Sequence, residues 1–291
     1  MSRPRPHRPP LHALVEGFSR HRPMVAERPA RRVRDGVAQA IADPVAVETP
    51  VVLVYNDVSQ AVMMATPADL EDFAVGFSLT EGIVGRAGEI AELSLADVAL
   101  GLEIRMAIPE DRGSRLRERQ RSVEGRTGCG LCGIMSLEQA LRPLPVIGRA
   151  PLIEAGAIAT ALAALPPLQL ANQASGAAYA AAFAAADGDI RLVRKDVGRH
   201  NAFDKLIGAM ARERVDPASG FVLLTSRFSA ELVQKAAIAG IAVVAAVSAP
   251  TTLAIELAEA AGVTLIAFAR GHGFTLYSHP GRVRCPQVGP S

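Results

Sequence analysis

Two cysteines three positions apart, Cys129 and Cys132, are the residues of this chain best suited to chemistry, and glycines flank both. The C-x-x-C spacing lets one thiol attack a sulfur carried by the other, lets the two form a disulfide, or lets both bind one metal ion. The glycines allow a partner's sulfur to approach closely, and nearby arginines favour the reactive thiolate. The pattern favours a reactive pair, while metal binding and an inert surface pair stay open.

Two common C-x-x-C sites fit the surrounding sequence less well. A structural zinc ion needs four ligands, and the third cysteine, Cys285, stands in the tail beside a proline. A thioredoxin-type pair directly follows a strand and opens a helix, whereas this pair follows a long polar segment. The odd cysteine count does not suit a disulfide framework. We therefore expect a reducing compartment and a cytoplasmic protein.

Basic residues at expected strand ends and helix starts form a second group of candidates. Arg199 stands before an expected helix, and Arg227 follows an expected strand. A further strand runs into a glycine-punctuated loop, Phe268-Ala269-Arg270-Gly271-His272-Gly273. Such positions bind anions in α/β sheets. Together these segments indicate an anionic ligand.

The run 194–201 around Arg199 also has a simpler structural interpretation. Asp196 would cap the helix and Arg199 would be solvated, and His200 alone is weak evidence of a general base. For this run in isolation, the structural interpretation is the better one. Neither a P-loop nor a G-x-G-x-x-G fingerprint follows any expected strand, which argues against ordinary nucleotide enzymes.

The elements that must position these residues predict an α/β (α+β) protein in four parts. Residues 1–40 form a basic, disordered arm, 41–110 a smaller β-rich subdomain, 111–150 a mobile loop that carries the C-x-x-C pair, and 151–291 a layered α/β domain. The first subdomain should hold a hairpin around Asn56-Asp57, a helix within 66–82 and strands at 91–98 and 101–108. The last part alternates short buried strands with helices of about ten residues, which predicts a partly parallel sheet.

Composition narrows the function. The chain has 291 residues, 49% hydrophobic and only 4% aromatic, with a net charge of +2. Such a charge and so few aromatics argue against nucleic-acid binding. No apolar stretch approaches the ~20 residues of a membrane span, so we expect none.

Five ordered segments resemble the formate dehydrogenase accessory sulfurtransferases, the FdhD family, over about residues 49–282. They are PVVLVYN (50–56), FAVGFSLTEGI (73–83), CGLCG (129–133), DVGRHNAFDK (196–205) and SAPT (248–251). The resemblance implies a sulfurtransferase that accepts persulfide sulfur from a cysteine desulfurase. It would pass this sulfur to the molybdenum bis-guanine-dinucleotide cofactor for formate dehydrogenase, with Cys129 as carrier and Cys132 as second thiol.

The resemblance also implies a cofactor site and a fold. Residues 268–273 align with the family's cofactor-binding segment, with Arg199 and Arg227 as further phosphate contacts, and a guanine nucleotide can stand in for the cofactor. The carboxyl-terminal domain would be similar to cytidine deaminases, and a homodimer is the default. The sequence argues against deamination itself, because no histidine begins an H-x-E motif and Gly128, not Pro, precedes Cys129.

This chain departs from the family pattern at Ser175, Tyr179, Lys195 and His272-Gly273, which points to shifted specificity. Two other classes of function stay open: a chaperone that binds cofactor and the formate dehydrogenase apoenzyme without carrying sulfur, and a small zinc-binding interaction module.

Overall fold

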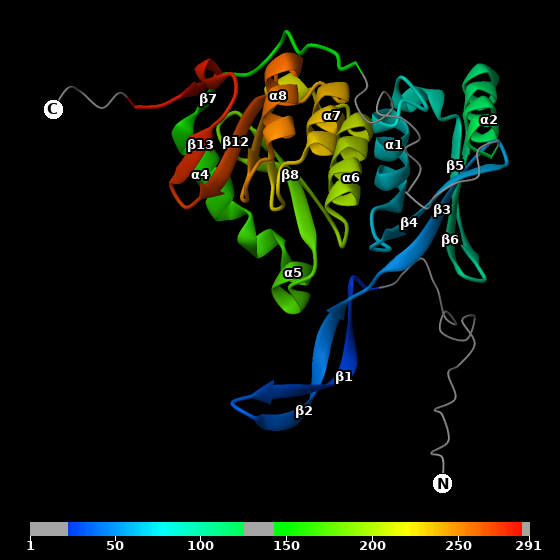
Figure 1. The fold of residues 1–291 in the computed structure, drawn as a ribbon, viewed down its shortest axis with the longest axis horizontal. Coiled ribbons are helices and arrows are strands. Elements are labelled where there is room, and N and C mark those ends of the chain that lie inside the picture. Colours follow the sequence, from blue (N-terminus) through cyan, green and yellow to red (C-terminus); the bar gives the residue numbers. More distant parts are fainter. Residues whose placement is uncertain (1–22, 125–142, 287–291) are drawn as a thin grey trace.

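The structure is a computed structural model that describes residues 23–124 and 143–286 (Figure 1). Its described part has two sheet-based bodies and a projecting hairpin. The mixed α/β class predicted from the sequence is confirmed. Cys129 and Cys132 lie outside the described residues.

The smaller body is a four-stranded sheet covered on one face by helix α1 (Leu70–Thr80). Its strands lie in the order β4 (Val58–Ala65), β3 (Thr49–Tyr55), β6 (Gly101–Ala107) and β5 (Glu92–Val98). Asn56 and Asp57 form the tight β3–β4 turn with positive φ angles of 45° and 64°, which asparagine and aspartate tolerate. The predicted hairpin, helix and later strands are confirmed.

The larger body is built on a six-stranded sheet in the order β13-β12-β11-β10-β8-β9. The central strands β10, β11 and β12 are parallel, and the outer pairings are antiparallel. The strands are β8 (Tyr179–Ala185), β9 (Ile190–Asp196), β10 (Gly220–Leu224), β11 (Val243–Ala246), β12 (Thr264–Arg270) and β13 (Gly273–Leu276). The prediction of a partly parallel sheet is confirmed.

Helices cover this sheet, and its central strands are buried on both faces. The helices are α4 (Ala155–Ala164), α5 (Leu170–Ser175), α6 (Arg199–Arg212), α7 (Ala230–Ile238) and α8 (Thr252–Ala261). Short strands β7 (Ile153–Glu154) and β14 (Val283–Arg284) pair beside them, and 3-10 turns span Ala87–Glu89, Pro166–Leu168, Pro217–Ser219 and Pro280–Arg282. Helix α5 had not been predicted, since it is only six residues long.

The two bodies meet where α1 crosses α6 (Figure 1). A Cβ at Gly76 of α1 would lie 1.8 Å from the carbonyl oxygen of Asp204, and one at Gly208 of α6 would lie 1.8 Å from that of Asp72. Each glycine therefore faces the backbone of the other helix. The crossing needs both residues to lack a side chain.

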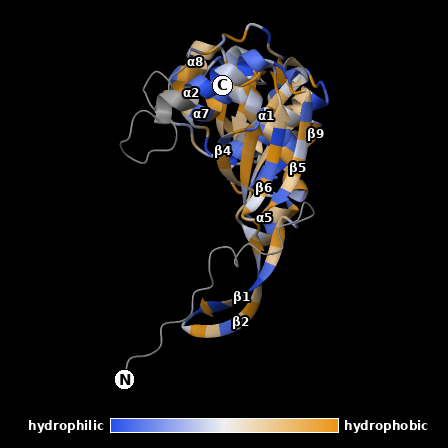
Figure 2. Ribbon diagram, turned by 90° about the vertical axis from the view of Figure 1, so that its right-hand side faces the viewer, coloured by the Kyte–Doolittle hydropathy of each residue, from blue (hydrophilic) through white to orange (hydrophobic). Residues whose placement is uncertain are grey.

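The prediction of a disordered arm over 1–40 is wrong for residues 25–40. Strands β1 (Val25–Arg34) and β2 (Val37–Ala46) form a projecting hairpin that leads into β3 of the smaller body and contacts α5 of the larger one (Figures 1 and 2). Its turn is Asp35-Gly36, with φ angles of 49° and 79°. This aspartate-glycine pair is a strong hairpin signal, which the high arginine content obscured.

The prediction of a loop from residue 111 is wrong as far as residue 124, because helix α2 spans Glu110–Glu124. Pro109 precedes it, and Glu110 and Asp111 occupy its first turn, where carboxylates interact favourably with the helix dipole. The segment has little apolar character, so we had predicted a loop. Arginine and glutamate are nonetheless good helix formers.

Candidate functional site

The carboxyl ends of the parallel strands bring several of the predicted anion-binding residues to one edge of the larger sheet. Arg227 follows β10, and Arg270 ends β12. Strand β9 runs in the same direction as β10, because both are antiparallel to β8, so Arg199 also follows a strand end at this edge. Three helices, α6, α7 and α8, begin here, and their amino termini favour anions.

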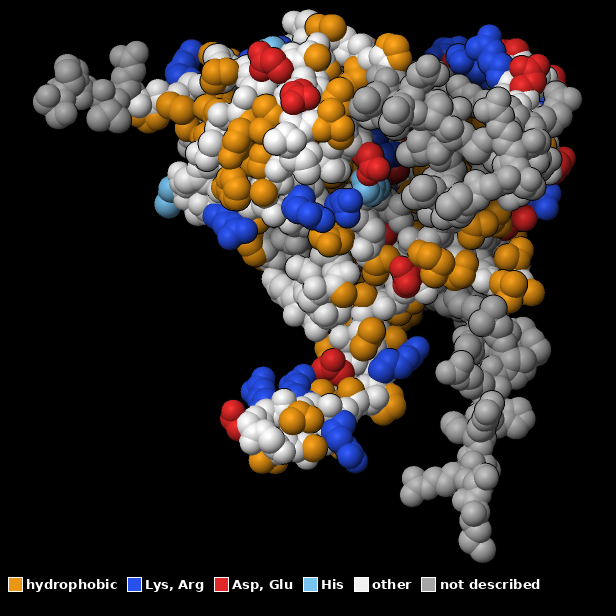
Figure 3. All heavy atoms as spheres, in the orientation of Figure 1, with side chains coloured by type: hydrophobic (Ala, Val, Ile, Leu, Met, Phe, Trp, Pro, Cys, Tyr) orange, Lys and Arg blue, Asp and Glu red, His pale blue; other side chains and the backbone are white. Residues whose placement is uncertain are grey.

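Hydrogen bonds to backbone carbonyls hold the loops at this edge together. The amide of Phe228 donates to the carbonyl of Ala249 over 3.1 Å, and the amide of Phe268 donates to that of Ser248 over 3.2 Å. Arg270 Nε donates to the carbonyl of Val247 over 3.1 Å. The loops after β10, β11 and β12 thus form one surface, and the face in Figure 3 carries a row of basic side chains across the lower part of the larger body.

The segment 268–273 forms the turn from β12 into β13. Phe268 has a φ of 53° and is 46% exposed, an unusual combination for a bulky aromatic residue. Gly271 also has a positive φ, and His272 and Gly273 are exposed beside it, whereas Ala269 is buried. Strain of this kind gathers at binding sites. The turn offers an aromatic face and exposed polar groups to a ligand.

Asp196 differs from its predicted role. Gly198, not Asp196, caps α6. The buried Asp196 carboxylate pairs with Lys205 Nζ at 2.6 Å and accepts hydrogen bonds from the backbone amide of Thr66 at 2.9 Å and from Asn201 Nδ2 at 3.1 Å. Because Thr66 belongs to the segment between β4 and α1, Asp196 joins the two bodies.

A second buried ion pair lies at the same helix crossing. Lys235 Nζ of α7 contacts both carboxylate oxygens of Asp204 at 2.9 and 3.0 Å, the hydroxyl of Thr80 at 2.9 Å and Glu81 at 3.3 Å. Burial raises the pKa of Asp204, and the nearby Lys235 opposes this shift. Much of the charged DVGRHNAFDK run therefore has a structural role.

His200 has a different environment at the start of α6. Its Nε2 lies 2.5 Å from Oε2 of Glu231 in the first turn of α7, and the side chain is 29% exposed. Burial lowers the pKa of His200, with Arg199 and Lys235 acting in the same direction and Glu231 opposing them. Neither Glu231 nor Ser229 had been selected from the sequence, because their relevance comes from the packing of α7 against α6.

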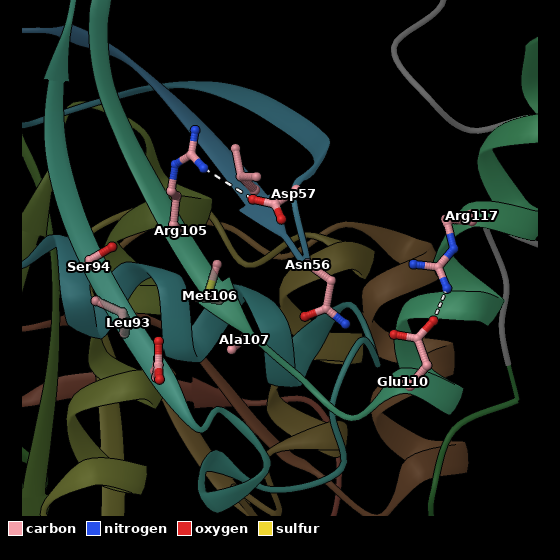
Figure 4. Close-up of a pocket in the computed structure, with 11 residues that line it drawn as sticks. Asn56, Asp57, Leu93, Ser94, Arg105, Met106, Ala107, Glu110 and Arg117 are labelled. Atoms are coloured by element: carbon pink, nitrogen blue, oxygen red, sulfur yellow. Dashed lines mark hydrogen bonds and ion pairs between the residues drawn. The ribbon is translucent and has the colours of Figure 1, made fainter.

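A pocket with a volume of about 850 Å³ lies elsewhere, on the smaller body (Figure 4). Its polar lining residues are largely paired with one another: Arg105 with Asp57 at 3.1 Å, and Arg117 with Glu110. None of the predicted site residues lines it. We therefore place the candidate site at the strand edge, where the predicted anion-binding residues lie.

Within residues 23–124 and 143–286, no group of three or more histidine, cysteine, aspartate or glutamate residues could hold a metal ion. In the same ranges, no helix is long and apolar enough to cross a membrane.

Comparison with known proteins identifies the family. The FdhD/NarQ family model matches residues 46–284. The chain belongs to the FdhD/NarQ family. The FdhD resemblance noted in the sequence is thus confirmed.

Curated FdhD relatives match nearly the whole chain. A sulfur carrier protein FdhD from Xanthomonas euvesicatoria is 50% identical over 262 residues, which cover 90% of this chain and 93% of the relative. One from Bordetella petrii is 47% identical over 261 residues, 89% of this chain and 94% of the relative.

A solved structure shares the fold. A protein from Desulfotalea psychrophila, described as a formate dehydrogenase accessory protein, superimposes with a TM-score of 0.73 at 23% identity. The match covers 90% of this FdhD chain and all of the other.

Proposed function

We propose that this FdhD chain is a sulfurtransferase that carries sulfur as a persulfide on Cys129, with Cys132 as a second thiol. It receives the sulfur from a cysteine desulfurase and passes it to the molybdenum bis-guanine-dinucleotide cofactor required by formate dehydrogenase. The observation that carries the proposal is the C-x-x-C pair in a chain half-identical to relatives named as sulfur carriers. A persulfide divides one transfer into two thiol-exchange steps.

The strand edge is the proposed cofactor site. A dinucleotide cofactor presents phosphates and guanine rings. Arg199, Arg227 and Arg270 beside three helix starts provide the positive potential that phosphates need, and the exposed Phe268 gives a face on which a base can stack. A guanine nucleotide should bind the same turn, 268–273, in place of the whole cofactor.

Four finer expectations remain part of this proposal: a cytoplasmic location, a homodimer, contact with the formate dehydrogenase apoenzyme, and a cytidine-deaminase-like larger domain. The central parallel strands β10, β11 and β12 with helices between them support the last of these.

The test is activation of formate dehydrogenase in cells that lack their own FdhD. Cys129→Ala should abolish activation, while the matched Cys285→Ala, at the exposed third cysteine, should leave it intact. Full activation by the double variant Cys129→Ala, Cys132→Ala would instead support a chaperone that carries no sulfur.

A further inference from the structure

Three buried polar atoms without a hydrogen-bond partner lie where α6 and α7 begin. They are Arg199 Nε, His200 Nε2 and Ser229 Oγ. In the described ranges, Thr49 Oγ1 and Gln60 Oε1 are the only other buried side-chain atoms of this kind. Native proteins pair nearly all such atoms, so a group of three at one junction calls for an explanation.

The junction is held together by His200 and Glu231. Their close contact joins the first turns of the two helices, yet it lacks hydrogen-bond alignment, so His200 Nε2 keeps no well-directed partner. One turn deeper, Asp204 and Lys235 form the buried pair described above, four residues along each helix. The Asp204–Lys235 pair, whose hydrogen bonds are all made within the protein, thus lies beneath the partly exposed His200–Glu231 pair, where a hydrogen-bonding atom is left over.

The polar atoms at this junction suit an anion and a proton acceptor together. Arg199 Nε and Ser229 Oγ are hydrogen-bond donors, and both helix amino termini carry partial positive charge. His200 is held toward its neutral form and can therefore accept a proton at neutral pH. A partner carboxylate that orients the imidazole is the usual arrangement of a general base.

We propose that His200 is the proton-transfer residue of the sulfur-transfer reaction, with Glu231 as its positioning residue, and that an anionic sulfur binds beside it against Arg199 and Ser229. This inference rests on the proposed sulfur-carrier function. It adds a defined site for the reacting thiol, which shares Arg199 with the proposed cofactor site.

The step balances without an external oxidant or reductant. Neutral His200 takes the proton from an acceptor thiol, and the resulting thiolate, stabilised by Arg199 and Ser229, attacks the outer sulfur of the donor persulfide. The new S–S bond forms as the old one breaks, and its electron pair leaves with the donor sulfur. That thiolate takes up the proton that His200 gives back. A persulfide and a thiol give a thiol and a persulfide.

The test follows sulfur release from the whole protein after loading with inorganic polysulfide. Persulfide remaining on the chain is measured by mass spectrometry after addition of mercaptoethanol, or of the more acidic trifluoroethanethiol, which ionises without a base. His200→Gln should slow release to mercaptoethanol about 100-fold, and release to the acidic thiol much less. A purely structural role for His200 would slow both equally.

The pH profile adds a second readout. Release to mercaptoethanol should rise with pH as His200 loses its proton, and His200→Gln should remove this inflection. Glu231→Gln should move it to lower pH, because Glu231 is the carboxylate that favours the charged imidazole, while Arg199 and Lys235 disfavour it. The ion pair between Asp204 and Lys235 is present in both proteins, so it does not account for a difference between their pH profiles.

The matched control is His279→Gln. His279 also lies near a carboxylate, 3.9 Å from Glu259, but it precedes the final 3-10 turn beyond β13. This variant should release sulfur at the wild-type rate. Release by His200→Gln at the wild-type rate and with the wild-type pH profile would overturn the inference alone. A wild-type protein that takes up no sulfur would contradict the sulfur-carrier function as well.

Discussion

Helix α6 carries two kinds of charged contact, and the difference between them separates structure from function. In its interior, Asp204 and Lys205 belong to buried ion pairs in which several hydrogen bonds surround the charges. At its start, Arg199 Nε has no hydrogen-bond partner, and His200 Nε2 has only the carboxylate of Glu231 beside it. A saturated pair holds two bodies together. An unsaturated group is available to bind something else.

The largest expected effect comes from breaking the saturated cluster. Lys205→Ala leaves the buried Asp196 carboxylate without its cation, and this should lower the free energy of unfolding by about 3–5 kcal/mol. Chemical denaturation measures it. The matched control is Lys195→Ala on β9, whose Nζ makes one hydrogen bond, to the carbonyl of Leu168. An equal decrease in the free energy of unfolding in both variants would show that the buried ion pair stabilises the protein no more than Lys195 does.

A somewhat smaller effect is expected at the helix crossing itself. Gly208→Ala places a Cβ against the carbonyl of Asp72, and α1 must move to relieve the clash, which should cost about 1–3 kcal/mol or more. Gly156→Ala on α4 is the control, because nothing lies within 4 Å of its Cβ. That variant should be stabilised by about 0.5–1 kcal/mol. Thermal unfolding measures the stability of both variants. A Gly208→Ala protein as stable as the wild type would show that the helix crossing tolerates a side chain at this position.

At the strand edge, substitution should change binding and leave stability alone. Arg270→Ala removes a charged donor from the turn 268–273 and should weaken binding of guanosine diphosphate about ten- to a hundred-fold. Calorimetric titration measures the affinity. Arg191→Ala, an exposed arginine paired with Asp189 at the opposite end of β9, should bind as wild type does. Unchanged affinity in Arg270→Ala would remove this turn from the proposed cofactor site.

The smallest effect is a pH dependence of stability at His200. Its pKa is lower in the folded protein, so the unfolded chain binds more protons once the pH falls below the ordinary histidine value. Stability should therefore decrease as the pH falls through that range, and His200→Gln should decrease less. Denaturation midpoints at several pH values compare the two. Parallel pH profiles would show that the folded protein does not disfavour the imidazolium.

Sequence reasoning predicted the elements of both sheets because their apolar residues alternate or recur at helical spacing, as in Val51, Leu53 and Tyr55 of β3. The predictions were wrong in two segments where they rested on amino-acid composition and not on the spacing of apolar residues. The arginine-rich composition of two segments predicts a disordered arm and a loop, whereas the structure has hairpin β1–β2 and helix α2 there. The Asp35-Gly36 turn signal was present in the first segment, and helix propensity was present in the second.

The candidate site was predictable only in part. Arg227 and Arg270 could be chosen because strand ends in α/β sheets meet at one edge. The role of Asp196 could not be foreseen, because its partner Thr66 lies 130 residues away in the chain and Lys205 lies on the following helix. The same holds for His200, since Glu231 reaches it only through the packing of α7 against α6.

The most direct test of the central claim is the mass of the peptide that contains Cys129 and Cys132 after incubation with a cysteine desulfurase and cysteine. We predict a gain of one sulfur atom, removed by reductant and absent from Cys129→Ala. A peptide of unchanged mass in the wild-type protein, with sulfur released only as free sulfide, would contradict the assignment of this chain as a sulfur carrier.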